Sequence, residues 1–420
     1  MTADSGIRNE IAGVAVSDLA ARYGSPFYAY DVASIDARLK RLEKFDVVRY
    51  AQKAWSNLAV LDHLRRRGAL VDSVSGGEIL RALAAGYSPQ GEPPPIVYTA
   101  DLFDDDALRL VVEHEIPVNC GSPHMIEQLA AVAPGREITL RINPGFGHGL
   151  SQKTNTGGPQ SKHGIWHSDV AACLEQTAQL GLTVTGIHMH IGSGTDFEHL
   201  SEVCRSLEDV ALSVGDSITN ISAGGGLPIP YRAGDEDINA DRYFELWDAT
   251  RRRLQDAFGH PLWLEIEPGR YLVAEAGYLV TQVRAVKQMG PNLFYLVDAG
   301  FNNLARPILY GAYHPMSIAP ADGSLARSTQ SVIVGGPLCE SGDIFTQEEG
   351  GFVAPRQLPQ AEVGDWLVIE CAGAYGQVMA SNYNSKPFAA EVWIDHQTDT
   401  LIRPRQSLQS LFDSERIPAK

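Results

Sequence analysis

The segment Val47-Val48-Arg49-Tyr50-Ala51-Gln52 is a mostly apolar run that predicts a buried β-strand, and Lys53 follows it directly. A lysine that leaves the rim of a buried strand loses hydration, which disfavours its ammonium form. The free amine that results is the nucleophile that Schiff-base chemistry requires. Lys53 is therefore the first candidate catalytic residue, although a strand-end lysine taken alone is more often solvated or ion-paired.

The alternation of strand and helix around this segment continues along the chain. Val203, Leu207, Val210 and Val214 recur at three- and four-residue spacing, which predicts a helix with one stripe packed on the strands. Eight apolar strands separated by such helices predict a (β/α)8 barrel over residues 31–275, although a doubly wound open sheet shares the alternation. The predicted strands are Val47–Gln52, Leu70–Val74, Ile96–Thr99, Pro117–Asn119, Ile138–Asn143, Val184–His190, Thr219–Ser222 and Leu262–Glu267.

The pattern changes after about residue 275, where strands follow one another without comparable helices. This change predicts a second, mostly β domain made of residues 276–420 together with residues 1–30. Within the first segment, Pro26–Tyr30 is a short strand that can pair with this domain. The loop Pro144–His163 is longer than most loops, and it follows the fifth barrel strand on the rim that carries the chemistry. The predicted β-domain strands are Gly277–Lys287, Leu293–Asp298, Ser331–Gly335, Trp366–Ile369 and Ala390–Asp395.

Composition excludes several classes of partner. The formal net charge of −17 over 420 residues would repel a phosphate backbone, so nucleic acid is not an expected partner. No run of about 18 apolar residues is present, and the N-terminus does not resemble a signal peptide, so no membrane span or export is expected. The five cysteines form no CxxC pair and no zinc-ligand spacing. A reduced, cytoplasmic protein without a metal site is the simplest interpretation.

Two motifs near the end of the barrel point to one cofactor. Gly224-Gly225-Gly226 follows the seventh strand, where barrel proteins often bind phosphate and where glycine lets backbone amides approach an anion closely. Glu267 closes the eighth strand, and a carboxylate there could keep a pyridine nitrogen protonated. Together with the amine of Lys53, these motifs suggest a pyridoxal 5′-phosphate (PLP) site. A flexible turn and a rim salt bridge are the alternatives for each motif alone.

Other polar residues are less decisive individually. His188 and His190 alternate on the sixth strand, so His190 could stack on a flat cofactor while His188 is a candidate core histidine. Arg270 could bind a phosphate or a substrate carboxylate through two hydrogen bonds. Cys339 lies in the polar loop Gly336–Asp343 rather than in an apolar stripe. Tyr375 and the segment Arg306–Tyr310 likewise place polar groups in predicted turns.

Taken together, these motifs resemble the diaminopimelate decarboxylases, which are PLP enzymes of the alanine-racemase-like fold type III. The resemblance extends over nearly the full chain, from Ser25 to the region of Arg403. The segments that carry it are Ala51-Gln52-Lys53-Ala54, His190-Ile191-Gly192-Ser193-Gly194, Gly224-Gly225-Gly226, Glu267-Pro268-Gly269-Arg270 and Cys339-Glu340-Ser341-Gly342-Asp343. The family implies conversion of meso-2,6-diaminopimelate to L-lysine and CO2 by a homodimer with shared active sites.

The resemblance also implies a role for each matching position. Lys53 would bind PLP covalently, His190 would stack on its ring and Glu267 would pair with its nitrogen. Arg270, Arg306 and Tyr310 would hold the distal carboxylate of the substrate, and Arg270 would also bind the cofactor. Glu340 would bind the distal ammonium, and Cys339 would protonate the product carbon from the partner subunit. The phosphate and its surroundings would be bound by Ser193, Gly224, Gly225, Gly226, Gly269 and Tyr375.

Three related activities remain as alternatives. One is a decarboxylase for another carboxylate-bearing amino acid, because Arg270 and Arg306 disfavour substrates that carry only a cation at the far end. The second is an amino-acid racemase, which is expected to carry a tyrosine in place of Cys339. The third is a non-catalytic PLP-binding homologue, which would keep Lys53 and lose the Cys339-Glu340 loop.

Overall fold

The computed structural model describes residues 6–147, 156–190 and 196–419. The chain folds into two compact units. The first, which we call the barrel unit, comprises residues 38–229 and 236–271. The second, which we call the β unit, comprises residues 1–37, 230–235 and 272–420. The short segment 230–235 therefore groups with the β unit, although the chain on both sides of it belongs to the barrel.

Eight parallel strands close the barrel unit. Each pairs with the next along the chain, and the last strand pairs with the first through Glu265 opposite Val47 and Ile266 opposite Val48. This closure confirms the predicted (β/α)8 barrel and excludes an open sheet. A ninth short strand, β9 (Ile165–Trp166), pairs with β8. The barrel strands are β4 (Val47–Ala51), β5 (Leu70–Ser73), β6 (Ile96–Ala100), β7 (Val118–Cys120), β8 (Glu137–Asn143), β10 (Thr183–Met189), β11 (Asn220–Ser222) and β12 (Trp263–Ile266).

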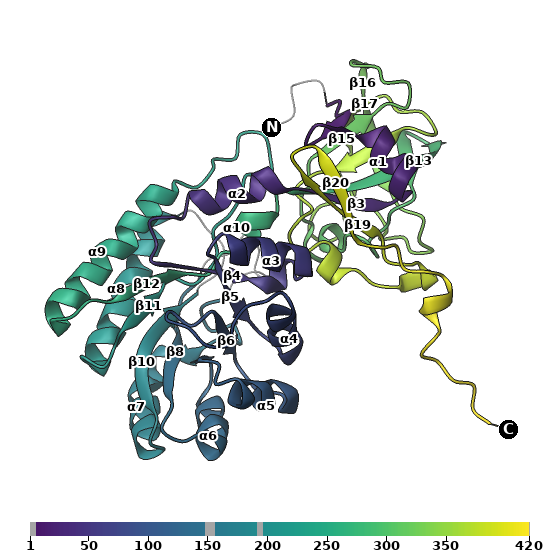
Figure 1. Ribbon diagram of the computed structural model, residues 1–420. Helices are drawn as coiled ribbons and strands as arrows, with labels where there is room; N and C mark the ends of the chain where they lie inside the picture. Colours follow the sequence, from purple (N-terminus) through teal and green to yellow (C-terminus); the bar gives the residue numbers. More distant parts are fainter. Residues whose placement is uncertain (1–5, 148–155, 191–195, 420) are drawn as a thin grey trace. The chain divides into compact units, whose positions relative to one another are not determined.

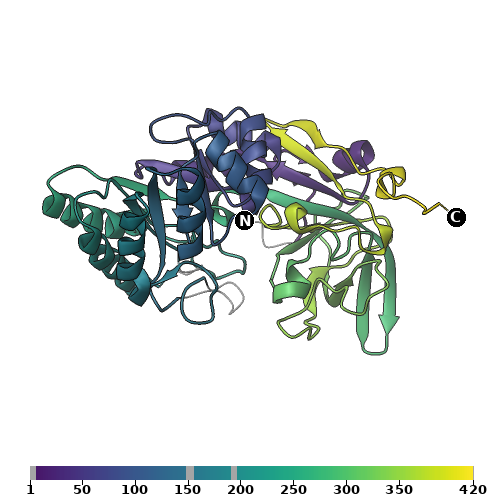
Figure 2. The ribbon, with the colours of Figure 1, turned by 90° about the horizontal axis from the view of Figure 1, so that it is seen from below.

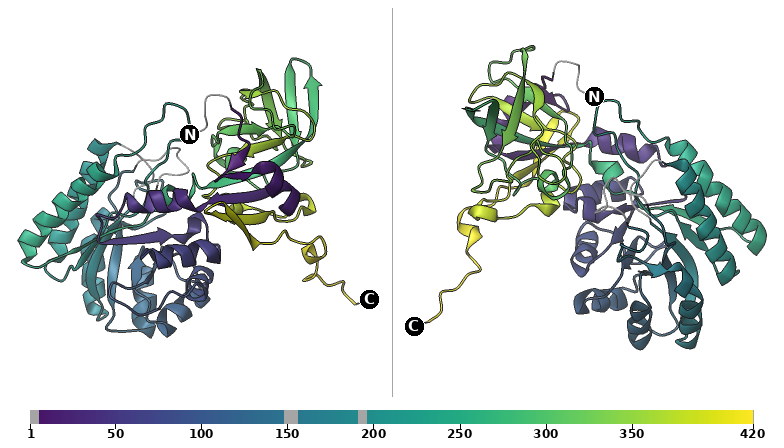
Figure 3. Two further views of the ribbon diagram at one scale, coloured as in Figure 1. Left: turned by 45° about the horizontal axis from the view of Figure 1, so that its top comes forward. Right: turned by 180° about the vertical axis from the view of Figure 1, so that it is seen from behind.

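The helices of this unit lie on the outer side of its strands (Figure 2). Several begin at a capping side chain that accepts a hydrogen bond from a backbone amide in the first turn, as Ser75 does for α4 and Ser122 for α6. The two longest helices, α8 and α9, lie side by side (Figure 3). The helices are α3 (Leu58–Arg66), α4 (Gly76–Ala84), α5 (Asp105–Glu113), α6 (Pro123–Val132), α7 (Val170–Gln179), α8 (Phe197–Val214) and α9 (Ala240–Phe258), and the short α10 (Arg270–Val273) begins in this unit and ends in the β unit.

The β unit is built on a mixed sheet whose strands come from both ends of the chain (Figure 1). The N-terminal strand β3 (Phe27–Asp31) lies between β13 (Gly277–Met289) and β19 (Ala390–Asp395). This pairing confirms the prediction that an early segment joins the C-terminal sheet. The remaining sheet strands are β14 (Asn292–Val297), β15 (Met316–Ala319), β16 (Thr329–Gly335), β17 (Arg356–Pro359), β18 (Trp366–Ile369) and β20 (Thr398–Arg403).

An apolar cluster in this unit joins its first residues to its last strands. It includes Ile11, Leu19, Phe27, Val280 and Val392, all of them fully buried. The N-terminal hairpin β1 (Glu10–Ile11) and β2 (Val14–Ala15) leads into α1 (Val16–Tyr23), which supplies part of this cluster. Helix α2 (Val32–Lys40) leads into the barrel unit, and the short helix α11 (Arg306–Tyr310) follows β14. Among the described residues, no helix combines the length and hydrophobicity needed to cross a bilayer.

Candidate active site

Lys53 lies in a turn at the carboxyl end of β4. The strand ends at Ala51, and a 3-10 turn over Gln52–Ala54 continues the chain. Gln52 and Ala54 are buried, whereas the side chain of Lys53 is exposed. The expectation that the strand rim buries this amine is therefore wrong, because the turn leaves the side chain exposed, although its charge still acts on Asp72 and His190. Its position at the end of β4 is as predicted.

A glycine that follows the last barrel strand supports this turn. A Cβ atom on Gly269 would lie 3.3 Å from the Cβ atoms of both Ala51 and Ala54, closer than most packed side chains come. The amide of Ala51 also donates a hydrogen bond to the Pro268 carbonyl, with an N–O distance of 3.1 Å. The absence of a side chain at Gly269 therefore lets the segment after β12 pack closely against the turn that carries Lys53.

Glu267 is a buried carboxylate held by two side chains from the nearby strands β10 and β11. It lies directly after β12 and is 6 % exposed. His188 Nε2 lies 2.7 Å from Glu267 Oε2, and Ser222 Oγ donates to Oε1 over 3.1 Å. Burial alone would raise the pKa of the Glu267 carboxyl, but the positive charge and hydrogen bond of His188 lower it below its ordinary value. Glu267 is thus an ionised carboxylate inside the barrel.

His188 therefore binds a specific partner, Glu267, in addition to filling space in the core. Its side chain is 1 % exposed, and its only described hydrogen bond is through Nε2, since Nδ1 has no partner among the described atoms. This pairing could have been predicted from the sequence, because His188 and Glu267 lie at the ends of strands β10 and β12, which are separated only by β11. His190 directly follows β10, two residues beyond His188.

His190 contributes a neutral ring. The amide of Gly225 donates a hydrogen bond to His190 Nδ1 over 3.0 Å. Burial, with the nearby positive charge of Lys53, holds the pKa of His190 well below its ordinary value. A neutral imidazole next to the lysine suits contact with a flat ring better than a hydrated imidazolium does. Ser193, also predicted to lie here, is outside the described residues.

The glycine motif after β11 fits tightly against neighbouring strands. The amide of Gly224 donates to Ser222 Oγ, so both it and the amide of Gly225 already bind side chains of the barrel. A Cβ atom on Gly225 would lie 2.5 Å from the Glu267 carbonyl oxygen. Gly224 and Gly225 are therefore needed for close packing beside Glu267, and Gly226, with φ of +96°, continues the turn.

Asp72 is a further acid at this rim that sequence analysis did not single out. It lies near the carboxyl end of β5, the strand next to β4, and is 3 % exposed. Burial, reinforced by the charge of Glu267, raises the pKa of Asp72 to about 6, and Lys53 opposes the shift. Asp72 Oδ1 and Gln52 Oε1 have no hydrogen-bond partner among the described atoms. In the sequence, Asp72 could have been recognised as an acid within the otherwise mostly apolar run Leu70–Ser73.

Three of the remaining candidates lie in the β unit, in α11 and in the loop after β16. Arg306 is the first residue of α11 and is buried, whereas Tyr310 at its end is half-buried. Cys339 is an exposed free thiol, and the other four cysteines are buried. Its amide donates to Asn384 Oδ1 over 2.7 Å. Cys339 is thus accessible for chemistry in a loop whose backbone is held in place.

Two more acids organise or extend this loop. Asp343 is 4 % exposed and accepts hydrogen bonds from the amides of Phe301 and Leu338, so it fixes the fold of the loop. Glu340, next to Cys339, is exposed. Asp343 therefore has a structural role, and Glu340 is the acid in this loop that remains accessible to a ligand.

Tyr375 lies in a strained turn after β18. Its φ is +57°, in the left-handed region that non-glycine residues seldom adopt. A Cβ atom on Gly373, two residues earlier, would lie 1.9 Å from the Val273 carbonyl oxygen. Backbone contact at Gly373 therefore fixes the turn that presents Tyr375. Such over-determined strain is commonly found at functional sites.

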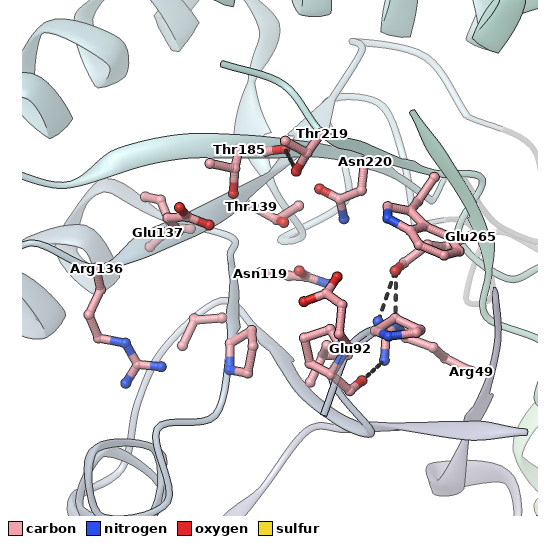
Figure 4. Close-up of a pocket in the computed structure, with 17 residues that line it drawn as sticks. Arg49, Glu92, Asn119, Arg136, Glu137, Thr139, Thr185, Thr219, Asn220 and Glu265 are labelled. Atoms are coloured by element: carbon pink, nitrogen blue, oxygen red, sulfur yellow. Dashed lines mark hydrogen bonds and ion pairs between the residues drawn. The ribbon is translucent and has the colours of Figure 1, made fainter. Parts of the chain in front are cut away.

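A separate cavity lies at the opposite end of the barrel. It measures about 290 Å³ and opens at the amino ends of the strands (Figure 4). The buried ion pair between Arg49 and Glu265, whose closest N–O distance is 2.8 Å, forms part of its lining. Thr139, Thr185 and Asn220 also line it. Because barrel enzymes place their chemistry at the carboxyl ends of the strands, this cavity is distinct from the site around Lys53.

Comparison with known proteins connects both units to one group of enzymes. The family model described as "Pyridoxal-dependent decarboxylase, pyridoxal binding domain" matches residues 32–274. A diaminopimelate decarboxylase from Streptomyces coelicolor is 53 % identical over 407 residues, which cover 97 % of this chain and 92 % of that protein. A crystal structure of a diaminopimelate decarboxylase superposes with a TM-score of 0.94 at 50 % identity and covers 99 % of this chain and 98 % of that one.

A more distant structure adds a ligand. The diaminopimelate decarboxylase of Helicobacter pylori, crystallised in complex with L-lysine, has a TM-score of 0.83 at 30 % identity. The match covers 95 % of this chain and 98 % of that one. The similarity to these enzymes therefore includes the β unit with Arg306 and Cys339, and is not confined to the barrel.

Proposed function

Because the chain belongs to the pyridoxal-dependent decarboxylases and, within them, to the diaminopimelate decarboxylases, we infer that it converts meso-2,6-diaminopimelate to L-lysine and CO2 with PLP as cofactor. One observation carries this conclusion, namely the 53 % identity that spans 97 % of the chain. A relationship limited to the barrel would support only PLP binding. The full-length relationship includes the loop with Cys339 and Glu340, which a non-catalytic homologue is expected to lose.

The residues at the barrel rim fit PLP. An amine, an ionised buried carboxylate and a neutral imidazole come from β4, β12 and β10, which are near neighbours in the closed sheet. The unpartnered atoms Asp72 Oδ1 and His188 Nδ1 show that the polar groups of this rim are not all satisfied by the described part of the protein. A polar ligand that binds at the rim is consistent with that arrangement.

Each of these residues would hold a different part of the cofactor. Lys53 would bind its aldehyde through the ε-amine, and Glu267 would pair with the pyridine nitrogen. His190 would contact the ring, and Gly226 with Ser193, Gly269, Arg270 and Tyr375 would surround the phosphate. When bound, PLP supplies a protonated ring that accepts the electron pair released as the substrate carboxylate leaves.

The hydrogen bonds of Glu267 explain how the protein supports that chemistry. A carboxylate with a lowered pKa stays ionised, so it can hold a proton on the nitrogen that it faces. The contacts from His188 and Ser222 fix its two oxygens before any ligand binds. A charge partner that is already oriented costs no reorganisation during the reaction.

The β unit would supply the groups that bind and protonate the substrate. The guanidinium of Arg306, with Tyr310, would bind the distal carboxylate, and Glu340 would bind the distal ammonium. The thiol of Cys339 would deliver a proton to the carbon that has lost CO2. Its exposure within the single chain agrees with a role at a site completed by a second subunit.

We further propose that the enzyme is a cytoplasmic homodimer with shared active sites. In this arrangement residues 31–275 bind the cofactor, whereas residues 1–30 and 276–420 contribute to the site and to the dimer interface. The supporting observation is the near-complete match to a family for which such dimers are implied. Nucleic acid is not a proposed partner, because the net charge of −17 would repel a phosphate backbone.

The direct test is product formation. Purified protein with PLP is incubated with meso-diaminopimelate, and L-lysine and CO2 are measured, with Lys53→Ala as the inactive control. A parallel panel of ornithine, lysine and arginine tests whether the distal carboxylate is required. Release of CO2 from one of these substrates but not from meso-diaminopimelate would contradict the proposal, and a change of product chirality without CO2 would indicate racemisation.

A further inference from the structure

Arg306 is held by two side chains that sequence analysis did not single out. Its Nη1 donates to Tyr231 Oη over 3.1 Å and lies 2.8 Å from His314 Nε2. Arg306 is 5 % exposed and His314 is fully buried. All three residues belong to the β unit, although Tyr231 comes from the segment 230–235, which interrupts the barrel sequence. The nitrogen Nη1 is therefore already committed to acceptors within the protein.

The hydrogen bonds of His314 determine its protonation state. Its Nδ1 lies 3.0 Å from the backbone carbonyl oxygen of Glu370, which can only accept, so Nδ1 carries the hydrogen. A guanidinium can only donate, so Nε2 presents its lone pair to Arg306. His314 is consequently neutral when both contacts are made. Tyr231, the other acceptor, packs edge-on against His314 with ring centroids 5.7 Å apart.

Backbone contacts also fix the segment that runs from Arg306 to His314. Gly311 ends α11 with φ of +59°, and the amide of Ala312 donates to the Arg306 carbonyl oxygen over 3.4 Å. On the far side, Arg356 donates to the carbonyl oxygen of His314. The imidazole is thus fixed through its ring and its backbone, and it cannot easily follow a displaced guanidinium.

Neither of these two acceptors carries a negative charge, and this affects how Arg306 can bind an anion. An acidic residue at position 314 would orient the guanidinium but would also cancel much of its attraction for a ligand carboxylate. A neutral histidine and a tyrosine hydroxyl orient it without adding a negative charge of their own. Because a flexible arginine loses conformational freedom when it binds, fixing it beforehand favours the ligand.

We propose that His314 and Tyr231 are positioning residues that hold Arg306 as a charged, oriented receptor for a carboxylate, and so set the preference for ligands with a distal carboxylate. This inference rests on the proposed role of Arg306 in substrate binding. It assigns the selectivity of the site to a neutral pair of acceptors behind the arginine, in addition to the arginine itself.

Two ligands that differ by one carboxylate test the proposal. L-lysine and 1,5-diaminopentane carry the same two amines on the same five-carbon chain, but only L-lysine has the carboxylate. We expect the wild-type holoenzyme to bind L-lysine about 10- to 100-fold more tightly, as measured by calorimetry and by competition with meso-diaminopimelate. His314→Leu should reduce this preference about 10-fold and leave binding of the diamine unchanged within about two-fold.

Conservative and matched variants separate positioning from general damage. His314→Gln keeps a neutral acceptor and should retain most of the preference for L-lysine. Tyr231→Phe keeps the aromatic ring but removes the hydroxyl acceptor, so it should lose part of that preference. Tyr231→Phe also provides a second test if His314→Leu fails to fold. Tyr295→Phe is the matched control, because it removes another buried hydroxyl of the β unit, which donates to Pro359. It should leave the preference unchanged.

The outcomes distinguish this inference from the function on which it rests. If Arg306→Gln abolishes the preference but His314→Leu and Tyr231→Phe do not, the positioning role is wrong and the role of Arg306 stands. Equal weakening of both ligands in the His314 variants also overturns it. If the wild-type enzyme shows no preference, or Arg306→Gln keeps it, the assignment of Arg306 fails and this inference fails with it.

Discussion

Glu267 illustrates how neighbouring polar groups reverse the effect of burial on a carboxyl group. At 6 % exposure an isolated carboxyl would be expected to hold its proton. The contacts from His188 and Ser222 keep it ionised instead. Asp72, two strands away in the closed sheet, lacks such partners for Oδ1, and its pKa is raised. Two acids at one rim therefore have opposite protonation tendencies, which is typical of acid–base sites.

The first prediction concerns the charge of Glu267. Glu267→Ala should lower kcat by about 10²- to 10³-fold, because the substitution removes an oriented charge partner for the cofactor nitrogen. The measurement is steady-state decarboxylation of meso-diaminopimelate, corrected for bound PLP by absorbance. Glu208→Ala, which removes the half-buried partner of the exposed Arg253 in the helical layer, is the control and should keep full activity. Near-normal turnover of the PLP-loaded Glu267 variant would rule out the role.

The second prediction concerns Asp72 and pH. Its pKa is raised from 3.8 to about 6, so the folded protein resists its ionisation more than the unfolded chain does. The resulting loss of folding stability is absent below pH 3.8, grows between pH 4 and 6, and reaches its full size above pH 6. A difference of about 2 pKa units corresponds to roughly 3 kcal/mol. Asp72→Asn should therefore stabilise the PLP-free protein at pH 8.

The measurement is the midpoint of thermal unfolding between pH 4.5 and 8, for the variant and for the wild-type protein. We expect the variant to gain roughly 5 °C at pH 8, with the gain shrinking as the pH falls below 6. Asp72→Asn keeps the size of the side chain and removes its ionisation, so the pH dependence of the difference isolates the charge. A constant difference across the pH range would show that Asp72 is not the group responsible.

Single residues were predictable from sequence where they end a strand or follow one. Lys53, His190 and Glu267 were found because apolar strands lead directly to them. His188 was interpreted as a core residue, since the partner that distinguishes it lies 79 positions away in the chain. Tyr231 and His314 were missed for the same reason. Their importance comes from contacts with Arg306 that no local pattern encodes.

At the scale of elements, strand position was more predictable than helix face. All eight barrel strands lie where the apolar runs predicted them, within one or two residues. In α8, however, Val210 and Val214 are only half-buried, and the buried stripe instead includes Cys204 and Ala211. Small residues pack closely between α8 and its neighbours without an obvious hydrophobic signal. Strands β15, β17 and β20 of the sheet were missed, and β15 and β17 are only four residues long and surrounded by turns.

The third prediction concerns the backbone contact that fixes the turn with Tyr375. A Cβ atom on Gly373 would lie 1.9 Å from the Val273 carbonyl oxygen, so one segment would have to move. Gly373→Ala should destabilise the β unit by about 3 kcal/mol or more. Thermal unfolding and soluble yield report the effect. PLP retention after gel filtration tests whether the displaced turn also weakens cofactor binding.

Gly77→Ala provides the matched control for this substitution. A Cβ atom on Gly77 would meet only Ser75 Oγ, at 3.8 Å, and the residue lies in the first turn of α4. Alanine should be neutral there or stabilise the protein by up to about 1 kcal/mol, because it favours helix. If both alanine variants unfold alike, the close contact at Gly373 does not limit the stability of the turn.

At the scale of the whole molecule, the chain passes repeatedly between its two units. Strand β3 precedes the barrel in sequence yet lies in the middle of the β sheet, and segment 230–235 leaves the barrel sequence to join the β unit. The predicted site residues are divided between the units in the same way. Lys53 and Glu267 belong to the barrel unit, whereas Arg306 and Cys339 belong to the β unit. The proposed activity therefore requires both.

The fourth prediction tests whether Cys339 acts across a dimer interface. Lys53→Ala and Cys339→Ser should each be nearly inactive alone, because each removes a group that the proposed reaction uses in every site. In a two-fold dimer with shared sites, a hybrid of the two variants contains one site that carries both substitutions and one that carries neither. Random mixing makes half of the dimers hybrid, so about a quarter of the wild-type activity should return.

The hybrids are formed by refolding or co-expressing the two differently tagged variants, and they are isolated by sequential affinity steps before the assay. Purified hybrids should then have about half of the wild-type activity per dimer, since one of two sites is intact. If Cys339 instead serves the Lys53 of its own chain, every site in a hybrid lacks one group and no activity returns. The same experiment with Lys53→Ala and Glu267→Ala is the control. Both groups belong to the barrel unit, so these hybrids should stay inactive in either arrangement.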